Sequence, residues 1–196
     1  MKILVATNNP GKIREYQNLM AELDYELVGL SDIGITTEVN ETGQTFEENA
    51  RLKAMAYGQA SGLLTLADDS GLEVQVLNGA PGVYSARYAG NGATDADRFR
   101  KLLAALEGVP WELRAARFRC VIALSWPDGH VETFEGQCNG VISLEPKGTH
   151  GFGFDPVFFM PEHGGTMAEL PEKVKNRISH RARAAALALA RLMAGE

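Results

Sequence analysis

The sequence predicts an α/β fold with a mixed β-sheet, flanking helices and one long antiparallel hairpin. Three observations support this prediction: strand-like apolar runs alternate with helical patterns, two long strand-like segments meet at a Gly-containing turn, and 45% of the residues are hydrophobic. That fraction is close to the average of globular proteins, so the chain can form a core. Its 196 residues fit one domain, residues 1–196, and show no internal repeat or flexible linker.

The first elements are a strand and a helix joined by a tight loop. Residues 2–7 (KILVAT) are apolar, which is typical of a buried strand, and residues 8–11 (NNPG) end it. From Lys12 to Leu23, apolar residues recur at helical spacing and predict a helix. Residues 25–30 resemble a second strand.

The second helix has clear signals at both ends. Thr45 is a good N-cap, and Glu48 three residues later completes a capping box. The pattern therefore predicts a helix over residues 46–60. Gly62 is expected to end it, because glycine readily adopts the left-handed conformation of a C-cap.

A pair of aspartates interrupts the next apolar stretch. A strand over residues 63–67 is expected to end at residues 68–71 (DDSG), and a further strand over residues 72–77 to follow. Residues 78–92 are rich in glycine and small side chains and predict an ordered loop. A helix over residues 93–106 comes next, with its start near Thr94 or Asp95.

The second half of the chain contains the strongest strand pattern. Residues 115–126 and 130–144 predict the long hairpin, and residues 146–156 predict a second Gly-rich loop. A terminal helix is predicted over residues 176–193, ending at Gly195.

The two cysteines, Cys120 and Cys138, are expected to be free thiols in the core. Both lie in the predicted hairpin, which we expect to turn at Asp128-Gly129. A two-residue turn would pair position 120 with position 137, so Cys138 would point to the opposite face of the sheet from Cys120. A cytoplasmic location, where disulfides are rare, favours the same interpretation.

Charge and hydropathy exclude several classes of function. The net charge of −6 argues against binding to nucleic acid, which needs a basic surface, although a local basic pocket could still bind a small phosphate ligand. The apolar run at the N-terminus is far too short for a signal sequence or a membrane span, and no later run approaches 18 residues. We therefore expect a cytoplasmic protein with no membrane partner.

Two segments carry residues suited to a phosphate and a metal ion. Residues 7–12 (TNNPGK) lead from a strand to a helix N-terminus, where backbone N–H groups, the helix dipole and Lys12 favour an anion. A plain turn would explain the same residues. Asp68 and Asp69 offer carboxylates suited to Mg²⁺ or to a general base, but a turn in which Asp and Ser bond the local backbone is an equal alternative.

Three further segments could complete a nucleotide site. Asn49 and Lys53 share one face of the predicted helix, as they would on any solvated helix. Residues 151–156 (GFGFDP) could place a ring against a nucleobase or could simply be core residues beside turns. Residues 179–181 (SHR), with Lys175 before them, could bind phosphate or form a basic helix surface. Together the segments supply what a nucleotide site needs.

Seven stretches in this order resemble the inosine/xanthosine triphosphate pyrophosphatase family (non-canonical purine NTP pyrophosphatases). They are TNNPGK, ETGQTFEENARLKA, ADDSGLEV, GAPGVYSARYAG, ARFRC, GFGFDPVF and ISHR, and the resemblance runs from residue 2 to about residue 193. It implies an elongated α/β fold with two lobes around a central substrate cleft, a homodimer and dependence on Mg²⁺. It also implies hydrolysis of ITP, dITP and XTP to the monophosphate and pyrophosphate, with a strong preference over ATP.

The resemblance also implies the roles of individual residues. Asp69 would be the metal-binding proton acceptor. The family often has an acidic metal ligand where this chain has Asn40. The second metal ligand would therefore be the carbonyl of Asn40, the carboxylate of Glu41 or a water molecule. The residues implied to bind substrate are Thr7, Asn8, Asn9, Pro10, Gly11, Lys12, Ser70, Phe152, Gly153, Phe154, Asp155, Lys175, His180 and Arg181.

Two other functions are compatible with the same motifs. One is a related pyrophosphatase that acts on modified pyrimidine or methylated nucleotides. The other is a nucleotide sensor without turnover, against which the Asp68-Asp69 pair argues.

Overall fold

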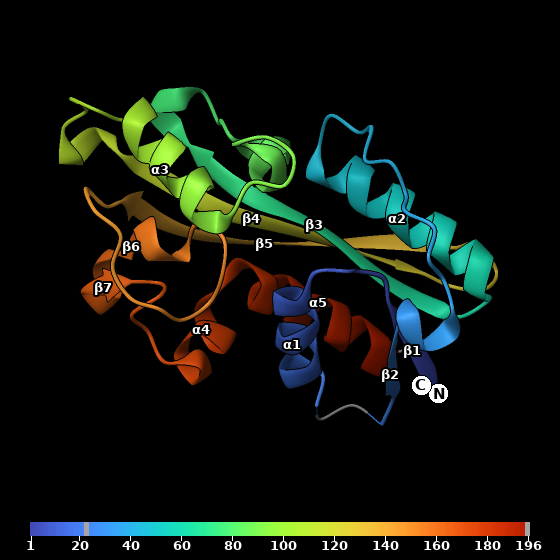
Figure 1. Cartoon of the computed structure of the whole chain (residues 1–196). Helices are drawn as coiled ribbons and strands as arrows, with labels where there is room; N and C mark the ends of the chain where they lie inside the picture. Colours follow the sequence, from blue (N-terminus) through green and yellow to red (C-terminus); the bar gives the residue numbers. More distant parts are fainter. Residues whose placement is uncertain (22–23, 195–196) are drawn as a thin grey trace. The chain divides into compact units, whose positions relative to one another are not determined.

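The structure, a computed structural model, describes residues 1–21 and 24–194 and divides into two compact units (Figure 1). Unit 1 comprises residues 1–69, 120–136 and the chain from residue 180 onward, and unit 2 comprises residues 70–119 and 137–179. The strands form one sheet in the order β2-β1-β3-β4-β5-β6-β7. The sheet is mixed and the hairpin long, which confirms the predicted fold class.

Three long strands contribute residues to both units. They are β3 (Leu64–Val74), β4 (Ala115–Ser125) and β5 (Val131–Ile142). Each unit therefore has its own part of the sheet and its own hydrophobic core.

In unit 1, a group of parallel strands is packed against helices. β1 (Lys2–Val5) pairs in parallel with β2 (Glu26–Gly29) and with β3. The helices are α1 (Pro10–Leu19), α2 (Phe46–Ser61) and α5 (His180–Met193), with a 3-10 turn, η1, at Ser31–Ile33. Figure 1 shows α1 beside α5, and their packing buries Tyr16 and Met20 with the alanines Ala184, Ala185 and Ala188. Small alanine side chains allow this close approach.

Unit 2 combines the other strands with short helices. β6 (Phe158–Met160) pairs antiparallel with β5 and with β7 (Gly165–Thr166), while α3 (Asp95–Ala105) and α4 (Glu172–Ile178) are the α-helices. The 3-10 turns are η2 (Gln75–Leu77), η3 (Gly82–Arg87), η4 (Trp111–Leu113), η5 (Asp155–Val157) and η6 (Pro161–His163). The core includes Leu72, Leu102, Phe118, Ile142 and Phe158.

A buried guanidinium joins several segments of unit 2. Arg114 is 3% exposed and donates hydrogen bonds to the carbonyl oxygens of Ile142, Leu106, Val109 and Ser143. Because one side chain donates to four carbonyl oxygens, Arg114 ties the end of α3 to the end of β5.

The local signals for helix ends are confirmed. Thr45 accepts the N–H of Glu48 and the Glu48 carboxylate accepts the N–H of Thr45, while Gly62 ends α2 in the left-handed region. Thr94 caps α3 in the same way. The predicted helix position of Leu23 and the predicted stop at Gly195 lie outside the described residues.

Two predicted elements are wrong. β3 runs without a break through residues 68–71, because its aspartates find buried partners and need no turn. The terminal helix is two helices: the backbone at Ser179 is extended, with φ −66° and ψ 157°, so α4 ends there and α5 begins at His180. Lys175 consequently lies inside α4.

The hairpin turn also differs from the predicted two-residue turn. The N–H of Trp126 donates to the carbonyl oxygen of His130, so the loop has three residues, with Gly129 in the left-handed region. This shifts the pairing by one residue and removes the argument that Cys120 and Cys138 point to opposite faces. Both cysteines are nevertheless free and buried, as predicted.

Candidate functional site

The neighbouring aspartates of β3 face two different sets of side chains in unit 1. Successive residues of a strand point to opposite faces of the sheet, so Asp68 and Asp69 cannot share one environment. Asp68 meets residues of α1, β4 and α5, whereas Asp69 meets residues of α2.

Asp68 lies in a buried network of charges. Its Oδ2 atom is 2.8 Å from Lys12 Nζ and 3.3 Å from Arg181 NH2, and it accepts a hydrogen bond from Cys120 Sγ at 3.7 Å. Burial by itself would raise the pKa of the Asp68 carboxyl, but the charges of Lys12 and Arg181 outweigh burial and hold it well below its usual range. Asp68 is therefore a permanent anion whose other oxygen, Oδ1, is buried without a hydrogen-bond partner.

Arg181 is the centre of this network rather than a surface cation. The residue is 2% exposed, and its guanidinium pairs with Glu15 Oε2 at 2.5 Å as well as with Asp68. Glu15 carried no recognisable signal in the sequence beyond its position on α1. The prediction that Arg181 binds substrate stays a prediction, and the structure adds that its positive charge is already balanced by two buried carboxylates.

Asp69 lies in a second cluster with residues of α2. Its Oδ2 accepts a hydrogen bond from Asn49 Nδ2 at 3.0 Å, and its Oδ1 is 3.8 Å from Lys53 Nζ. Lys53 Nζ also contacts Glu41 Oε1 at 2.5 Å. Asn49 and Lys53 share a helical face because they are four residues apart, and this face covers Asp69.

The electrostatics of the second cluster suit proton transfer. Burial, helped by the negative charge of Glu41, raises the pKa of Asp69 despite the positive charge of Lys53. Burial would lower the pKa of Lys53, but the carboxylates of Asp69, Asp68 and Glu41 raise it, so Lys53 stays charged. A carboxylate with raised proton affinity beside a fixed cation can accept a proton from a bound water.

The phosphate-loop candidate, residues 7–12, leads into the N-terminus of α1 as expected, but three of its backbone N–H groups already bond to side chains of the same loop. Asn9 caps α1, and its Oδ1 accepts the N–H groups of Gly11 and Lys12 at 2.9 and 3.2 Å. Thr7 Oγ1 accepts the N–H of Asn9. The exposed residues Asn8, Asn9 and Pro10 lead to Lys12, whose ammonium is held by Asp68.

Unit 2 contains the predicted site residues Ser70, 152–155 and Lys175. Asp155 Oδ2 is 2.6 Å from Lys175 Nζ and accepts the N–H of Phe152 at 2.9 Å. Lys175 Nζ lies 4.8 Å from the centre of the Phe152 ring. Gly151 must be glycine here, because its φ is +77° and a Cβ would lie 2.1 Å from Asp155 Oδ2.

Some predicted residues occupy other environments. Phe154 is 4% exposed, packs in the core of unit 2 and meets the edge of Tyr88, so its ring is a core side chain. Of the alternatives for the metal, Asn40 is exposed, whereas Glu41 belongs to the Asp69 cluster. His180 is buried at the start of α5, and Ser70 follows Asp69 in β3.

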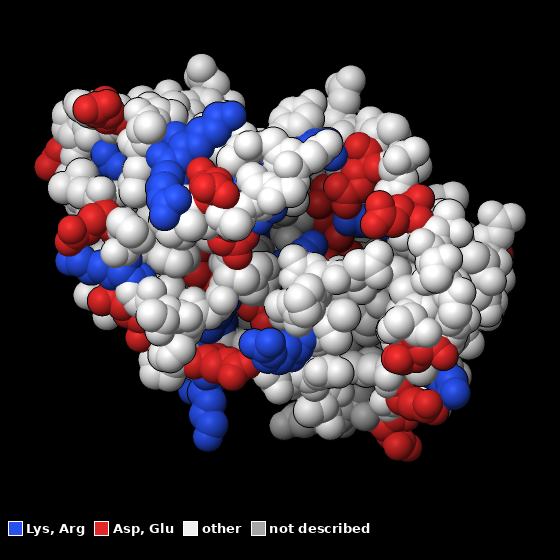
Figure 2. All heavy atoms as spheres, viewed as in Figure 1, with Lys and Arg blue, Asp and Glu red and all other residues white. Residues whose placement is uncertain are grey.

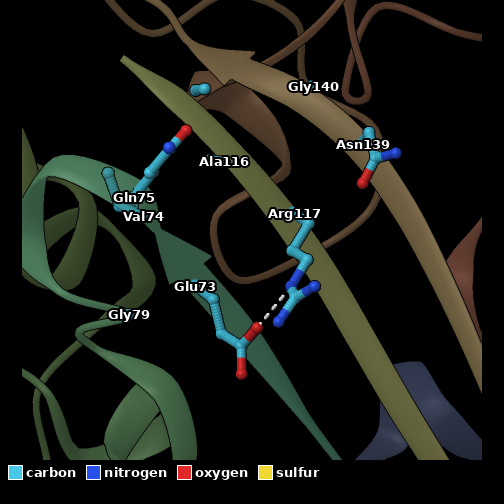
Figure 3. A pocket seen from close by; sticks show the side chains of 9 residues that line it. Glu73, Val74, Gln75, Gly79, Ala116, Arg117, Asn139 and Gly140 are labelled. Atoms are coloured by element: carbon cyan, nitrogen blue, oxygen red, sulfur yellow. Dashed lines mark hydrogen bonds and ion pairs between the residues drawn. The ribbon is translucent and has the colours of Figure 1, made fainter. Parts of the chain in front are cut away.

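A hollow of about 530 Å³ in unit 2 contains none of the predicted site residues (Figure 3). It is lined by the ends of β3, β4 and β5, and the Glu73–Arg117 ion pair of 2.6 Å crosses its wall. Its volume alone does not make it the active site, and its one lining carboxylate, that of Glu73, is paired with Arg117 and Arg119.

Comparison with known proteins identifies the family. The family model described as Ham1 family matches residues 3–191. The chain belongs to the Ham1 family. Its Ham1 relatives include the dITP/XTP pyrophosphatases of Geobacter sulfurreducens, 53% identical over 95% of this chain and 94% of the relative, and of Bacillus subtilis, 48% identical over 91% and 90%.

Solved Ham1 structures agree with the fold. The Ham1 protein of Staphylococcus aureus has a TM-score of 0.90 at 43% identity and covers 100% of both chains. A HAM1 protein from Coxiella burnetii has a TM-score of 0.90 at 42% identity and covers 98% of both chains. Family membership confirms the resemblance that the sequence motifs indicated.

Proposed function

We propose that this chain hydrolyses dITP, ITP and XTP to the monophosphate and pyrophosphate and so removes them from the nucleotide pool. The observation that carries the proposal is Asp69, a buried carboxylate with raised pKa held between Asn49 and Lys53. The relatives named dITP/XTP pyrophosphatases, at about half identity over nearly the whole chain, support the choice of substrate.

The reaction would be attack of water on the α-phosphorus with pyrophosphate as the leaving group. Asp69 would accept the proton of the attacking water or hold the metal ion, and these two roles stay open. Lys53 and Lys12 would supply positive charge to the phosphate oxygens, where most catalysis of phosphoryl transfer resides. Asp68 would keep the Lys12 ammonium in place through their 2.8 Å contact.

The carboxylates beside Lys53 fit Mg²⁺. Asp69 and Glu41 share this one ammonium, and both offer the hard oxygen atoms that Mg²⁺ prefers. In the described part of the chain, no group of three or more His, Cys, Asp or Glu side chains could hold a metal ion. Water and substrate phosphates would complete the shell, which is the usual arrangement for this ion. When bound, Mg²⁺ would offset negative charge on the triphosphate.

The residues proposed to contact the nucleobase belong to the loop that carries Phe152. The ring of Phe152 is the remaining aromatic platform, since Phe154 is in the core. The N–H groups of Phe152 and Gly153 already donate to Asp155 and Asp95, so they are not spare donors for a 6-keto group. Preference for inosine and xanthosine therefore rests on the relatives' names and on side-chain donors such as that of Lys175.

The charge distribution favours a small nucleotide over a nucleic acid. On the face drawn in Figure 2, Lys and Arg side chains are interspersed with Asp and Glu, and acidic side chains gather around the start of α2. A polyanion favours a continuous basic surface instead. None of the helices within residues 1–21 and 24–194 is long and apolar enough to cross a membrane.

Pyrophosphate release with Mg²⁺ tests the proposal. We expect kcat/KM for ITP, dITP and XTP to exceed that for ATP by about 10³-fold, the level that polar-matched sites reach. A modified pyrimidine triphosphate belongs in the same panel. Equal rates for ATP and ITP would contradict the house-cleaning role, and binding without release would indicate a sensor.

We also propose a cytoplasmic homodimer. Several large apolar side chains of unit 2 stay exposed, and we propose that a second copy covers them. They are Val76, Tyr84, Trp111, Leu113 and Leu144. Sedimentation of the full chain should give twice the monomer mass of 21.2 kDa, and a monomer at micromolar concentration would refute the dimer.

A further inference from the structure

The start of α3 holds the tip of the loop that carries Phe152. Asp95 Oδ2 accepts the N–H of Gly153 at 2.7 Å, across 58 residues of sequence, and Asp95 Oδ1 pairs with Arg98 NH1 at 2.5 Å. Both contacts lie within unit 2. Asp95 therefore uses one oxygen for its own helix and the other for the loop.

Asp95 is not needed as the cap of its helix. Thr94 accepts the N–H of Asp97 while the Asp97 carboxylate accepts the N–H and the hydroxyl of Thr94, so the capping box is complete without Asp95. A carboxylate in the first turn also interacts favourably with the helix dipole, but this effect is small for a partly exposed side chain such as that of Asp95. The bond to Gly153 is thus a separate function of the Asp95 side chain.

The loop around Phe152 depends on such bonds for its conformation. Phe152 lies between Gly151 and Gly153, both of which have left-handed backbones, with φ +77° and +66°. Glycine has the greatest conformational freedom of any residue, and no strand or helix includes Phe152. The Phe152 N–H bond to Asp155 fixes one side of the residue, and the Gly153 N–H bond to Asp95 fixes the other.

We propose that Asp95 is a positioning residue that holds Phe152 ready for the nucleobase. The proposal rests on the proposed function, in which Phe152 contacts the base. Without Asp95, the loop would sample other conformations, and binding would have to restore the productive one at a cost in affinity. The groups proposed for proton transfer and phosphate binding are in other segments, so the loss belongs in KM rather than in kcat.

Three variants of the full chain test the proposal. Asp95→Ala removes the acceptor, Asp95→Asn keeps an oxygen that can accept the Gly153 N–H, and Arg98→Ala is the matched control that removes the other partner of Asp95. We expect Asp95→Ala to raise KM for ITP, and Kd for inosine monophosphate, about 10-fold, with kcat within about twofold. Asp95→Asn and Arg98→Ala should stay within about threefold of the parent.

Amide exchange of Gly153 provides a readout that does not depend on activity. Its protection should fall in Asp95→Ala and persist in the other two variants, with thermal unfolding confirming that each is folded. Unchanged Gly153 protection or unchanged KM in Asp95→Ala would overturn the proposal. So would an Arg98→Ala variant that raises KM as much as Asp95→Ala does. If Gly153 exchange responds as expected but the parent neither binds inosine monophosphate nor releases pyrophosphate, the proposed function fails and the positioning role fails with it. If the parent hydrolyses ITP but Asp95→Ala behaves like the parent, only the positioning role of Asp95 is refuted and the proposed function stands.

Discussion

The same substitution at the adjacent positions Asp68 and Asp69 should affect different properties: protein stability at Asp68 and turnover at Asp69. Changing either aspartate to asparagine keeps the shape of the side chain and removes its charge. In the proposed mechanism, the charge of Asp69 serves catalysis at a cost in stability, whereas the charge of Asp68 stabilises the folded protein.

For Asp69→Asn, we expect kcat for ITP to fall at least about 100-fold, because a general base typically contributes that much. The free energy of unfolding should be unchanged or slightly higher. Burial raises the pKa of Asp69, which means that its charged form is less favourable in the folded protein than in the unfolded chain. A neutral amide avoids this cost and can still accept the hydrogen bond from Asn49.

For Asp68→Asn, we expect a loss of about 3 kcal/mol in the free energy of unfolding. Removing one member of a buried ion pair typically costs about 3–5 kcal/mol. We expect the lower end of this energy range because Arg181 keeps its contact with Glu15, and because the Lys12 side chain is 14% exposed and can reach solvent. Since the pKa of Asp68 is lowered in the folded state, its contribution is complete above the unfolded pKa of about 4 and is lost as the pH falls further.

Urea unfolding at pH 7, followed by tryptophan fluorescence, measures both stabilities, and pyrophosphate release measures kcat at a temperature where both variants are folded. The stability difference between the parent and Asp68→Asn should shrink below pH 4 or so. Equal stability of the parent and Asp68→Asn at pH 7 would refute the charge network, and parental turnover in Asp69→Asn would refute its assignment as catalytic.

Three other predictions follow from the site and the core. Lys12→Ala should raise KM for ITP more than it lowers kcat. Equal losses in kcat and kcat/KM would instead show that Lys12 stabilises only the transition state. As the pH is lowered, kcat/KM should begin to fall at a higher pH than an ordinary aspartate would give, because activity needs ionised Asp69 and its pKa is raised. A fall that begins only at about pH 4 or below would contradict this expectation. Arg114→Met should lower the free energy of unfolding by about 3 kcal/mol, because four carbonyl oxygens lose the hydrogen bond from the guanidinium. An unchanged midpoint of urea unfolding would contradict this expectation.

The elements that depend on near neighbours could be predicted from the sequence. The capping box of Thr45 and Glu48 and the C-cap Gly62 involve residues within one helical turn of the helix ends, so the local pattern contains all the information needed. The family could be recognised for a related reason, since its motifs are short, contiguous and ordered along the chain. Asp69 and Lys12 could be proposed as site residues because each lies within such a motif.

The partners of these residues could not be predicted in the same way. Alternation along β3 implies that Asp68 and Asp69 face opposite sides, but only the packing of the helices decides that α1 and α5 meet Asp68 and α2 meets Asp69. The predicted break at these aspartates was wrong for this reason: a polar pair indicates a turn unless distant cations are known to neutralise it.

By itself, the sequence determined the helix caps, the family and the chemical types of the proposed site residues. The tertiary structure alone decided that Phe154 is core, that Arg181 is enclosed by Glu15 and Asp68, and that Asp95 bonds Gly153. Helix caps and motifs are governed by interactions over a few residues, whereas the Arg181–Asp68 contact joins positions 113 residues apart. Contacts over such separations exist only because folding brings the segments together, and their burial then shifts the pKa values on which the proposed chemistry depends.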